Sequence, residues 1–168
     1  DELTSMPRMY IRYAPAGGLS STADDISKLM IALLNNGEYD GQEILEEDTV
    51  NLMFTQQYTP DPRMGGMSYG LFEHKANGET SYLRDGDGVG TKSRIFLMPE
   101  HDLGFFINYN EESSQLRLEI VDEFLNRYFP KDTEENATPI SDHKERVSRF
   151  EGTYQPIQAD LSSFAKIQ

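Results

Sequence analysis

The sequence predicts a domain that combines three helices with a four-stranded antiparallel sheet. Apolar residues recur at helical spacing in three segments, and four strand-like segments follow one another between the second helix and the third. The expected helices cover about residues 22–36, 46–54 and 114–129, and the expected strands cover residues 68–73, 80–84, 93–98 and 103–109. Because these strands are consecutive and joined by turns, they pair most simply as an antiparallel meander.

The first helix has the clearest signals for its position. Ser21 and Thr22 each stand three residues before an aspartate, as in a capping box, and Asn36-Gly37 can take the left-handed conformation that ends a helix. The expected inward-facing residues of the three helices are, in chain order, Ile26, Leu29, Met30, Leu33 and Leu34, then Val50, Met53 and Phe54, then Leu116, Ile120, Val121, Phe124, Leu125 and Tyr128. Pro130 ends the last helix.

Turn residues set the expected limits of the strands. Asn77-Gly78 is a strong hairpin signal between the first two strands. Every second residue of the segment 85–90, Asp-Gly-Asp-Gly-Val-Gly, is a glycine, and we expect a tight turn there. Residues 1–19 and 55–66 are rich in proline and glycine and are expected to be irregular.

The composition changes beyond Pro130. Residues 131–146 are charged and polar, which is typical of a linker, and residues 147–168 are too few to bury a core of their own. We therefore expect one domain over residues 1–130, a linker, and the incomplete start of a small second domain. Because the chain starts at Asp1 rather than at a methionine, its N-terminus is expected to have been processed or cut from something longer.

The charge balance excludes several classes of partner. Asp and Glu number 29 against 15 Lys and Arg, so the formal net charge is −14. A chain this acidic is unsuited to nucleic acid or to an anionic membrane surface. No apolar run approaches the roughly 20 residues of a membrane span, and the sequence contains no cysteine. No metal and no cofactor are expected, and His74, His101 and His143 are expected at the surface.

Three stretches in a fixed order carry a family resemblance. They are residues 15–26, residues 41–53, and residues 86–108 with their glycine-rich start and Pro99-Glu100. Together they resemble the C-terminal half of the serine β-lactamase-like family, which includes class C β-lactamases, penicillin-binding proteins and esterases. The resemblance implies a truncated α+β fold: an antiparallel sheet flanked by helices, with the active site between the sheet and a helical subdomain. Residues 150–154 are similar to the opening of a small β domain appended to some members.

The chain lacks the family's nucleophile in its usual context. The family uses an activated serine in a Ser-x-x-Lys motif, a Tyr-x-Asn loop, and a third motif on a strand. Ser-x-x-Lys occurs at Ser141–Lys144 and Ser163–Lys166, but both lie beyond the stretches that carry the resemblance, and Tyr-x-Asn is absent from the sequence. We interpret both matches as coincidences. No catalytic residue is therefore assigned here, the nucleophile is expected upstream, and the chain alone is expected to be inactive.

The third motif falls on Arg84-Asp85-Gly86, with Asp87 following. The family usually has Lys or His at the first position. An arginine remains protonated near neutral pH, so Arg84 could hold a carboxylate but could not relay protons. Alternatively, Asp85 and Asp87 could hold Arg84 in a local ion pair. A calcium loop is disfavoured, because Val89 and Phe96 stand where further ligands would be needed.

The first functional hypothesis is a fragment of a serine hydrolase that transfers acyl groups from a β-lactam, a peptide or a small ester. The alternative is a non-catalytic binding or regulatory module on the same scaffold. A third hypothesis is a structural α+β domain outside the family. The expected partner is a small-molecule or peptide substrate of the full-length protein, with self-association possible through exposed sheet. The sequence does not fix the compartment, although the resemblance suggests the cell envelope or the extracellular space.

Overall fold

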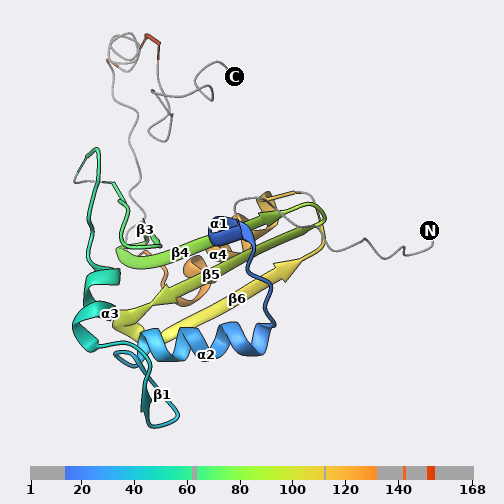
Figure 1. Cartoon of the computed structure of the whole chain (residues 1–168). Coiled ribbons are helices and arrows are strands. Elements are labelled where there is room, and N and C mark those ends of the chain that lie inside the picture. The colour runs from blue at the N-terminus through green and yellow to red at the C-terminus, as the bar shows by residue number, and fades with distance from the viewer. Residues whose placement is uncertain (1–13, 62–63, 112, 132–141, 143–150, 154–168) are drawn as a thin grey trace, which may run out of the picture. The chain divides into compact units, whose positions relative to one another are not determined.

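The computed structural model describes residues 14–61, 64–111, 113–131, 142 and 151–153 (Figure 1). The chain divides into a unit formed by residues 1–130 and a second unit formed by residues 131–168. Most of the predicted linker and second domain lies outside the described residues, as do both Ser-x-x-Lys serines. The architecture below is that of the first unit.

The sheet is the predicted antiparallel meander, although its first strand begins at Phe72 rather than at the predicted residue 68. Its strands are β3 (Phe72–Ala76), β4 (Glu79–Gly88), β5 (Thr91–Met98) and β6 (Leu103–Tyr109), in the order β3-β4-β5-β6 (Figure 1). Asn77 and Gly78 make the first turn with positive φ angles of 55° and 85°, which suits these two residue types. A short ribbon of β1 (Glu38–Tyr39) and β2 (Gln42–Glu43) was not predicted.

The helices are α1 (Ala14–Gly17), α2 (Ala23–Leu34), α3 (Glu47–Phe54) and α4 (Gln115–Tyr128), with a short 3₁₀ turn, η1, at Pro99–His101. The α+β class is therefore confirmed, although α1 lies in a segment that was expected to be irregular. The predicted cap of α2 is present, because the Thr22 side chain accepts a hydrogen bond from the Asp25 N–H at 3.1 Å. Among the described residues, no helix has the length and apolar character needed to span a bilayer.

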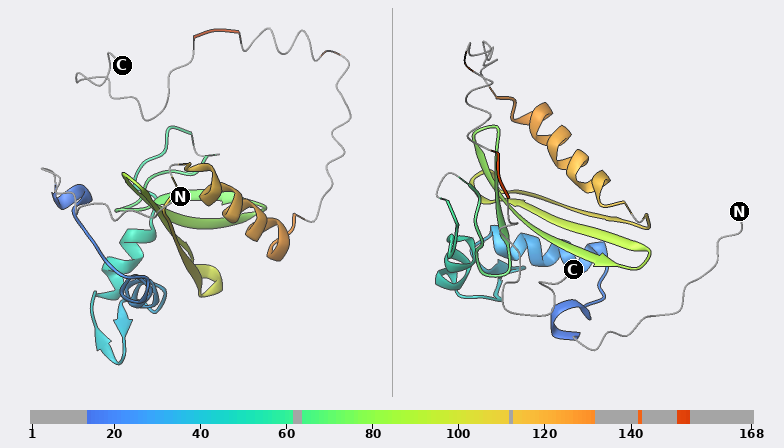
Figure 2. Two further views of the ribbon diagram at one scale, coloured as in Figure 1. Left: turned by 90° about the vertical axis from the view of Figure 1, so that its right-hand side faces the viewer. Right: turned by 90° about the horizontal axis from the view of Figure 1, so that it is seen from above.

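Two apolar cores lie on opposite faces of the sheet, and β5 contributes to both. Leu97 packs in the core that contains Met30 of α2 and Val50 of α3. Phe96 and Met98, its chain neighbours, pack with residues of α4 instead. Figure 2 shows α2 and α3 on one side of the sheet and α4 on the other. This division follows from the strand geometry, in which successive side chains point to opposite faces.

The buried side of α4 differs from the prediction. Leu116, Ile120 and Tyr128 were expected in the core but are 37%, 36% and 63% exposed. The residues that face the sheet are Arg117, Val121 and Leu125, spaced four apart. Arg117 was not among the expected inward-facing residues, so the buried face of α4 is rotated relative to the predicted one. Leu29 of α2, at 41% exposure, was also wrongly placed in the core.

The tight turn predicted at residues 85–90 is wrong over most of its length. Residues 85–88 continue β4, and the reversal occurs only at Val89 and Gly90, where Gly90 has a φ of 67°. Aspartate and glycine are both depleted in strands, so the local composition pointed to a turn. The pairing of β4 with β5 extends to Gly88 and Thr91 and overrides that preference.

His74 was expected at the surface but is half-buried in β3, on the side of α4. Its cross-strand partner is Ser81, which is 1% exposed. Burial lowers the pKa of His74, and Asp122 opposes this effect only partly. His101, by contrast, is exposed as expected, with its Nε2 atom 2.7 Å from Glu79.

Replacing Leu97 with alanine should test the central position of β5. Leu97→Ala leaves a cavity in the core beneath α2, so the free energy of unfolding should fall by about 2–5 kcal/mol. Urea denaturation followed by circular dichroism measures this change. Leu118→Ala is the matched control, because Leu118 is 44% exposed and its loss should cost no more than about 0.5 kcal/mol. Similar losses for the two variants would contradict the packing described here.

Candidate functional site

The stretch formed by residues 84–88 of β4 lies at an open edge of the sheet. The pairing of β3 with β4 runs from Ala76–Glu79 to Phe72–Leu83 and ends there. Beyond Leu83, β4 pairs only with β5 among the described residues. The third motif expected from the sequence therefore lies on backbone that has a strand neighbour on one side alone.

Arg84 lies on the face of the sheet that carries α2 and α3. Its cross-strand partner is Ile95, which packs against the same core as Leu97. The Arg84 side chain is exposed, and its guanidinium carbon lies 5.9 Å from the centre of the Phe72 ring. This contact leaves the guanidinium accessible, so Arg84 can bind an anion that approaches the open edge.

Glycines follow Arg84 on the same face of β4. A Cβ atom added to Gly86 would collide with the Ser93 hydroxyl, and one added to Gly88 would lie 2.8 Å from the Thr91 methyl group. The Ser93 hydroxyl also donates a long hydrogen bond of 3.5 Å to the Gly86 carbonyl oxygen. The backbone beyond Arg84 is thus covered by two small β5 side chains. Ser93 was not singled out from the sequence as part of the site.

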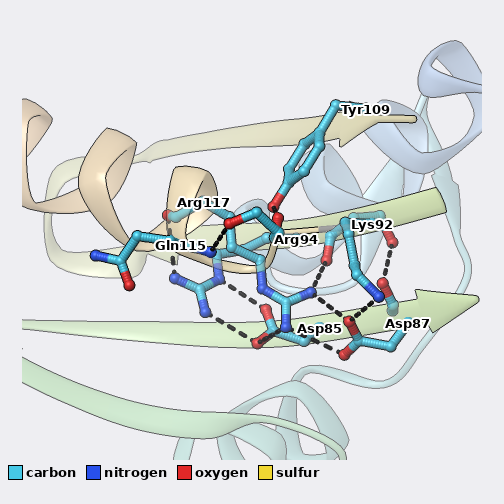
Figure 3. Close-up of polar contacts among 10 residues, drawn as sticks. Asp85, Asp87, Lys92, Arg94, Tyr109, Gln115 and Arg117 are labelled. Atoms are coloured by element: carbon cyan, nitrogen blue, oxygen red, sulfur yellow. Dashed lines mark hydrogen bonds and ion pairs between the residues drawn. The ribbon is translucent and has the colours of Figure 1, made fainter. Parts of the chain in front are cut away.

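Asp85 and Asp87 lie on the opposite face of β4, toward α4, and each is held by an arginine (Figure 3). Arg94 of β5 donates to both Asp85 carboxylate oxygens, at 2.7 Å from Nε and 2.9 Å from Nη2. Arg117 of α4 donates to both Asp87 oxygens at 3.1 Å. Two-point pairing of this kind is the strongest arrangement between a guanidinium and a carboxylate.

Further contacts join the two ion pairs into one network, called here the arginine clasp: Asp85, Asp87, Arg94 and Arg117. Arg94 donates to the Arg117 carbonyl oxygen at 3.2 Å, and Arg117 Nη2 lies 3.4 Å from Asp85. Lys92 lies 3.4 Å from Asp87 at the outer end. The clasp therefore connects β4, β5 and α4.

Burial and neighbouring charges have opposite effects on the pKa values of Asp87 and Arg117. The arginine side chains are only 5% and 8% exposed, whereas those of Asp85 and Asp87 are 30% and 52% exposed. The hydrogen bonds from Arg117 lower the pKa of Asp87, against the smaller effect of its burial. Burial works to lower the pKa of Arg117, but Asp87 and Asp85 together outweigh it and raise that pKa. These shifts keep the Asp87 carboxylate and the Arg117 guanidinium charged at neutral pH.

The structure thus separates the residues of the predicted third motif. Arg84 and Gly86 lie on one face of β4. On the other face, Asp85 pairs with Arg94 and Asp87 pairs with Arg117. The suggested local ion pair between Arg84 and these aspartates is not formed in the described residues. The described residues also contain no cluster of three His, Asp or Glu side chains placed to hold a metal.

A second polar cluster borders Arg84 along β4. Glu73, whose side chain is 8% exposed, accepts hydrogen bonds from the Gly66 N–H at 3.1 Å and from Gln56. Its neighbour Tyr82 donates to the Phe54 carbonyl oxygen at 2.6 Å, and burial, followed by the charge of Glu73, raises the pKa of Tyr82. These contacts fix the chain after α3 against the sheet. These contacts could not be predicted from local sequence patterns, since the partners are far apart in the chain.

The model of the family described as Beta-lactamase matches residues 2–123. This range includes Arg84 and the whole clasp, and it excludes Ser141 and Ser163. No curated protein matches the chain.

The pairing of Asp87 predicts an acid-dependent effect on stability. Since the pKa of Asp87 is lowered from 3.8 in the folded state, its contribution is present above that value and is lost as the pH falls through the folded pKa. Asp87→Asn should reduce the free energy of unfolding by about 1 kcal/mol at neutral pH. The difference from wild type should shrink as the pH falls below 3.8 and through the lowered pKa of Asp87. Urea denaturation at a series of pH values measures it, and a difference that stays constant would contradict this assignment.

Proposed function

This chain belongs to the Beta-lactamase family, and from that premise we propose that β4 binds the substrate of a serine acyl-transfer site. In this proposal Arg84 holds a carboxylate group of a small molecule. The substrate class is a β-lactam, a peptide or a small ester that carries such a group. Arg84 would orient the substrate through charge and hydrogen bonds, and other residues would transfer the protons.

The observation that carries this proposal is the separation of charges across β4. A guanidinium between two neutralising carboxylates would have little attraction left for a substrate. Here Asp85 and Asp87 are paired with Arg94 and Arg117 on the far side of the strand. Arg84 therefore keeps its charge available on the accessible face, where its flat fork of N–H donors matches the two oxygens of a carboxylate.

The acylating serine is proposed to come from residues outside this sequence. The family's chemistry needs a serine beside a general base, and the matched range contains neither Ser-x-x-Lys nor Tyr-x-Asn. In the proposal, this chain supplies binding and orientation to the full-length protein. Its aspartates would not oppose a developing oxyanion, because they face away from Arg84 and are paired.

A non-catalytic binding or regulatory module is the second candidate. It is favoured by one feature, namely that Arg84 stands where the family usually has a lysine or a histidine. Such a module would use the same face of β4 and the same carboxylate contact, without any covalent step. The two candidates therefore share the binding role of Arg84 and differ in whether the full-length protein turns over its ligand.

The isolated chain should not hydrolyse acyl substrates. Without a positioned nucleophile only orientation effects remain, so a chromogenic cephalosporin and a nitrophenyl ester should decay at the buffer rate. Absorbance at constant temperature follows both reactions. Turnover that disappears in Ser141→Ala or in Ser163→Ala would show that a Ser-x-x-Lys match in this chain is functional.

Arg84 should control binding of a carboxylate. We expect N-acetyl-alanine to shift the amide signals of residues 84–88 in NMR titrations of the chain, and N-acetyl-alaninamide, which lacks the charge, to have little effect. Arg84→Ala should weaken the binding by about tenfold, and Arg84→Lys by less, because lysine keeps the charge but loses the fork.

Arg127→Ala is the matched control for this experiment. Arg127 is exposed on α4, so its replacement removes a charge of the same sign without touching β4. It should bind N-acetyl-alanine like wild type. Equal binding by Arg84→Ala and wild type would exclude Arg84 from the site.

A further inference from the structure

The stretch formed by residues 84–88 has little to keep it extended from its own composition. It contains two glycines and two aspartates, residue types that weaken strands. It pairs with β5 alone among the described residues, and Gly86 and Gly88 contribute no side chain to the core on their face. An edge segment of this kind would be expected to fray.

The ion pairs that hold this stretch come from the α4 side. Asp85 is fixed by two hydrogen bonds from Arg94, and Asp87 by two from Arg117. Arg117 also donates to the Ser93 carbonyl oxygen at 3.4 Å, so one guanidinium touches both β4 and the strand beside it. The two clasped carboxylates flank Gly86 in the sequence, and they therefore fix the backbone on either side of it.

The clasp is anchored in the rigid part of the domain. Arg94 is 4% exposed as a residue and lies two positions before Phe96 on β5, while Arg117 is 7% exposed and lies one helical turn before Val121. Both neighbours belong to the core under α4. Movement of Asp85 or Asp87 away from this face would leave a buried guanidinium unpaired, which is costly.

We propose that Asp85, Asp87, Arg94 and Arg117 are positioning residues, which hold residues 84–88 extended so that Arg84 faces the substrate. This inference rests on the proposed function, which assigns substrate binding to the face of β4 that carries Arg84. The clasp itself does not touch the ligand. It acts through the backbone, because each clasped aspartate is next in sequence to Gly86 and Asp85 is also next to Arg84.

Hydrogen exchange in the 168-residue chain tests the inference without a ligand. Arg117→Met removes the fork from Asp87 while keeping the length and much of the apolar stem. The amides of residues 84–88 should then exchange at least about tenfold faster, while the amides of residues 96–98 should keep their wild-type rates. Arg117→Lys should recover only part of the protection, since it restores charge without the two-point geometry. Asp87→Asn changes the other partner of this ion pair and should cause a smaller loss of protection at residues 84–88.

Binding is measured in parallel with N-acetyl-alanine as the probe. The inference expects Arg117→Met to weaken binding severalfold, although Arg117 lies on the other face of the sheet. Arg127→Met, an exposed replacement on the same helix, should change neither exchange nor binding. Faster exchange spread equally over residues 84–88 and 96–98 would show a merely structural role and would overturn the inference. Unchanged exchange at residues 84–88 would overturn it as well.

The two readouts separate this inference from the proposed function. The first case is that wild type does not bind the probe, but residues 84–88 of Arg117→Met exchange faster than those of wild type. The proposed function then fails, and the ordering role of the clasp is supported. If wild type binds through Arg84 and Arg117→Met binds equally well, the proposed function is supported and the positioning role is refuted.

Discussion

The domain depends on β5 being covered on both faces. Phe96, Leu97 and Met98 are each fully buried although they are consecutive, which is possible only because α4 and the pair of α2 and α3 cover opposite sides. This constraint fixes the register of the sheet, since a shift by one residue would exchange the two sets of side chains. The helices therefore have defined places because β5 presents a different set of residues to each side.

The same alternation continues beyond the apolar part of the sheet. Arg94 follows the spacing of Phe96 and Met98 and so enters the layer between β5 and α4. A buried guanidinium there requires carboxylates, and Asp85, its cross-strand partner, supplies one. The polar network is thus an extension of the core under α4. Arg84 is sent to the other face by the same rule, so packing on one side determines which charge remains accessible on the other.

The sequence predicted much of the fold, because its signals were local. The apolar stripe and the Thr22 cap located α2, and Asn77-Gly78 located the first turn of the sheet. The errors arose where distant contacts override local preference. Residues 85–88 have the composition of a turn, yet they form a strand that pairs with β5, and two arginines distant in the sequence bind their aspartates. Arg117 was not expected on the buried face of α4, and Leu116 and Ile120 were wrongly placed there. Of the candidate site, Arg84 to Asp87 were found by counting along a motif, but their division between two faces needed the extended conformation that composition had argued against.

The placement of Arg84 also allows it to be substituted independently of its neighbours in the chain. Replacing Asp85 alone leaves the buried Arg94 guanidinium without its carboxylate, so Asp85 is constrained by Arg94. Arg84 packs into neither core, and its guanidinium stands over an aromatic ring at the margin of the sheet. Its substitution thus leaves the scaffold intact. If Arg84 binds the ligand as proposed, the preference for one ligand charge over another can change at this single position, while Asp85, its neighbour in the chain, stays fixed by its ion pair.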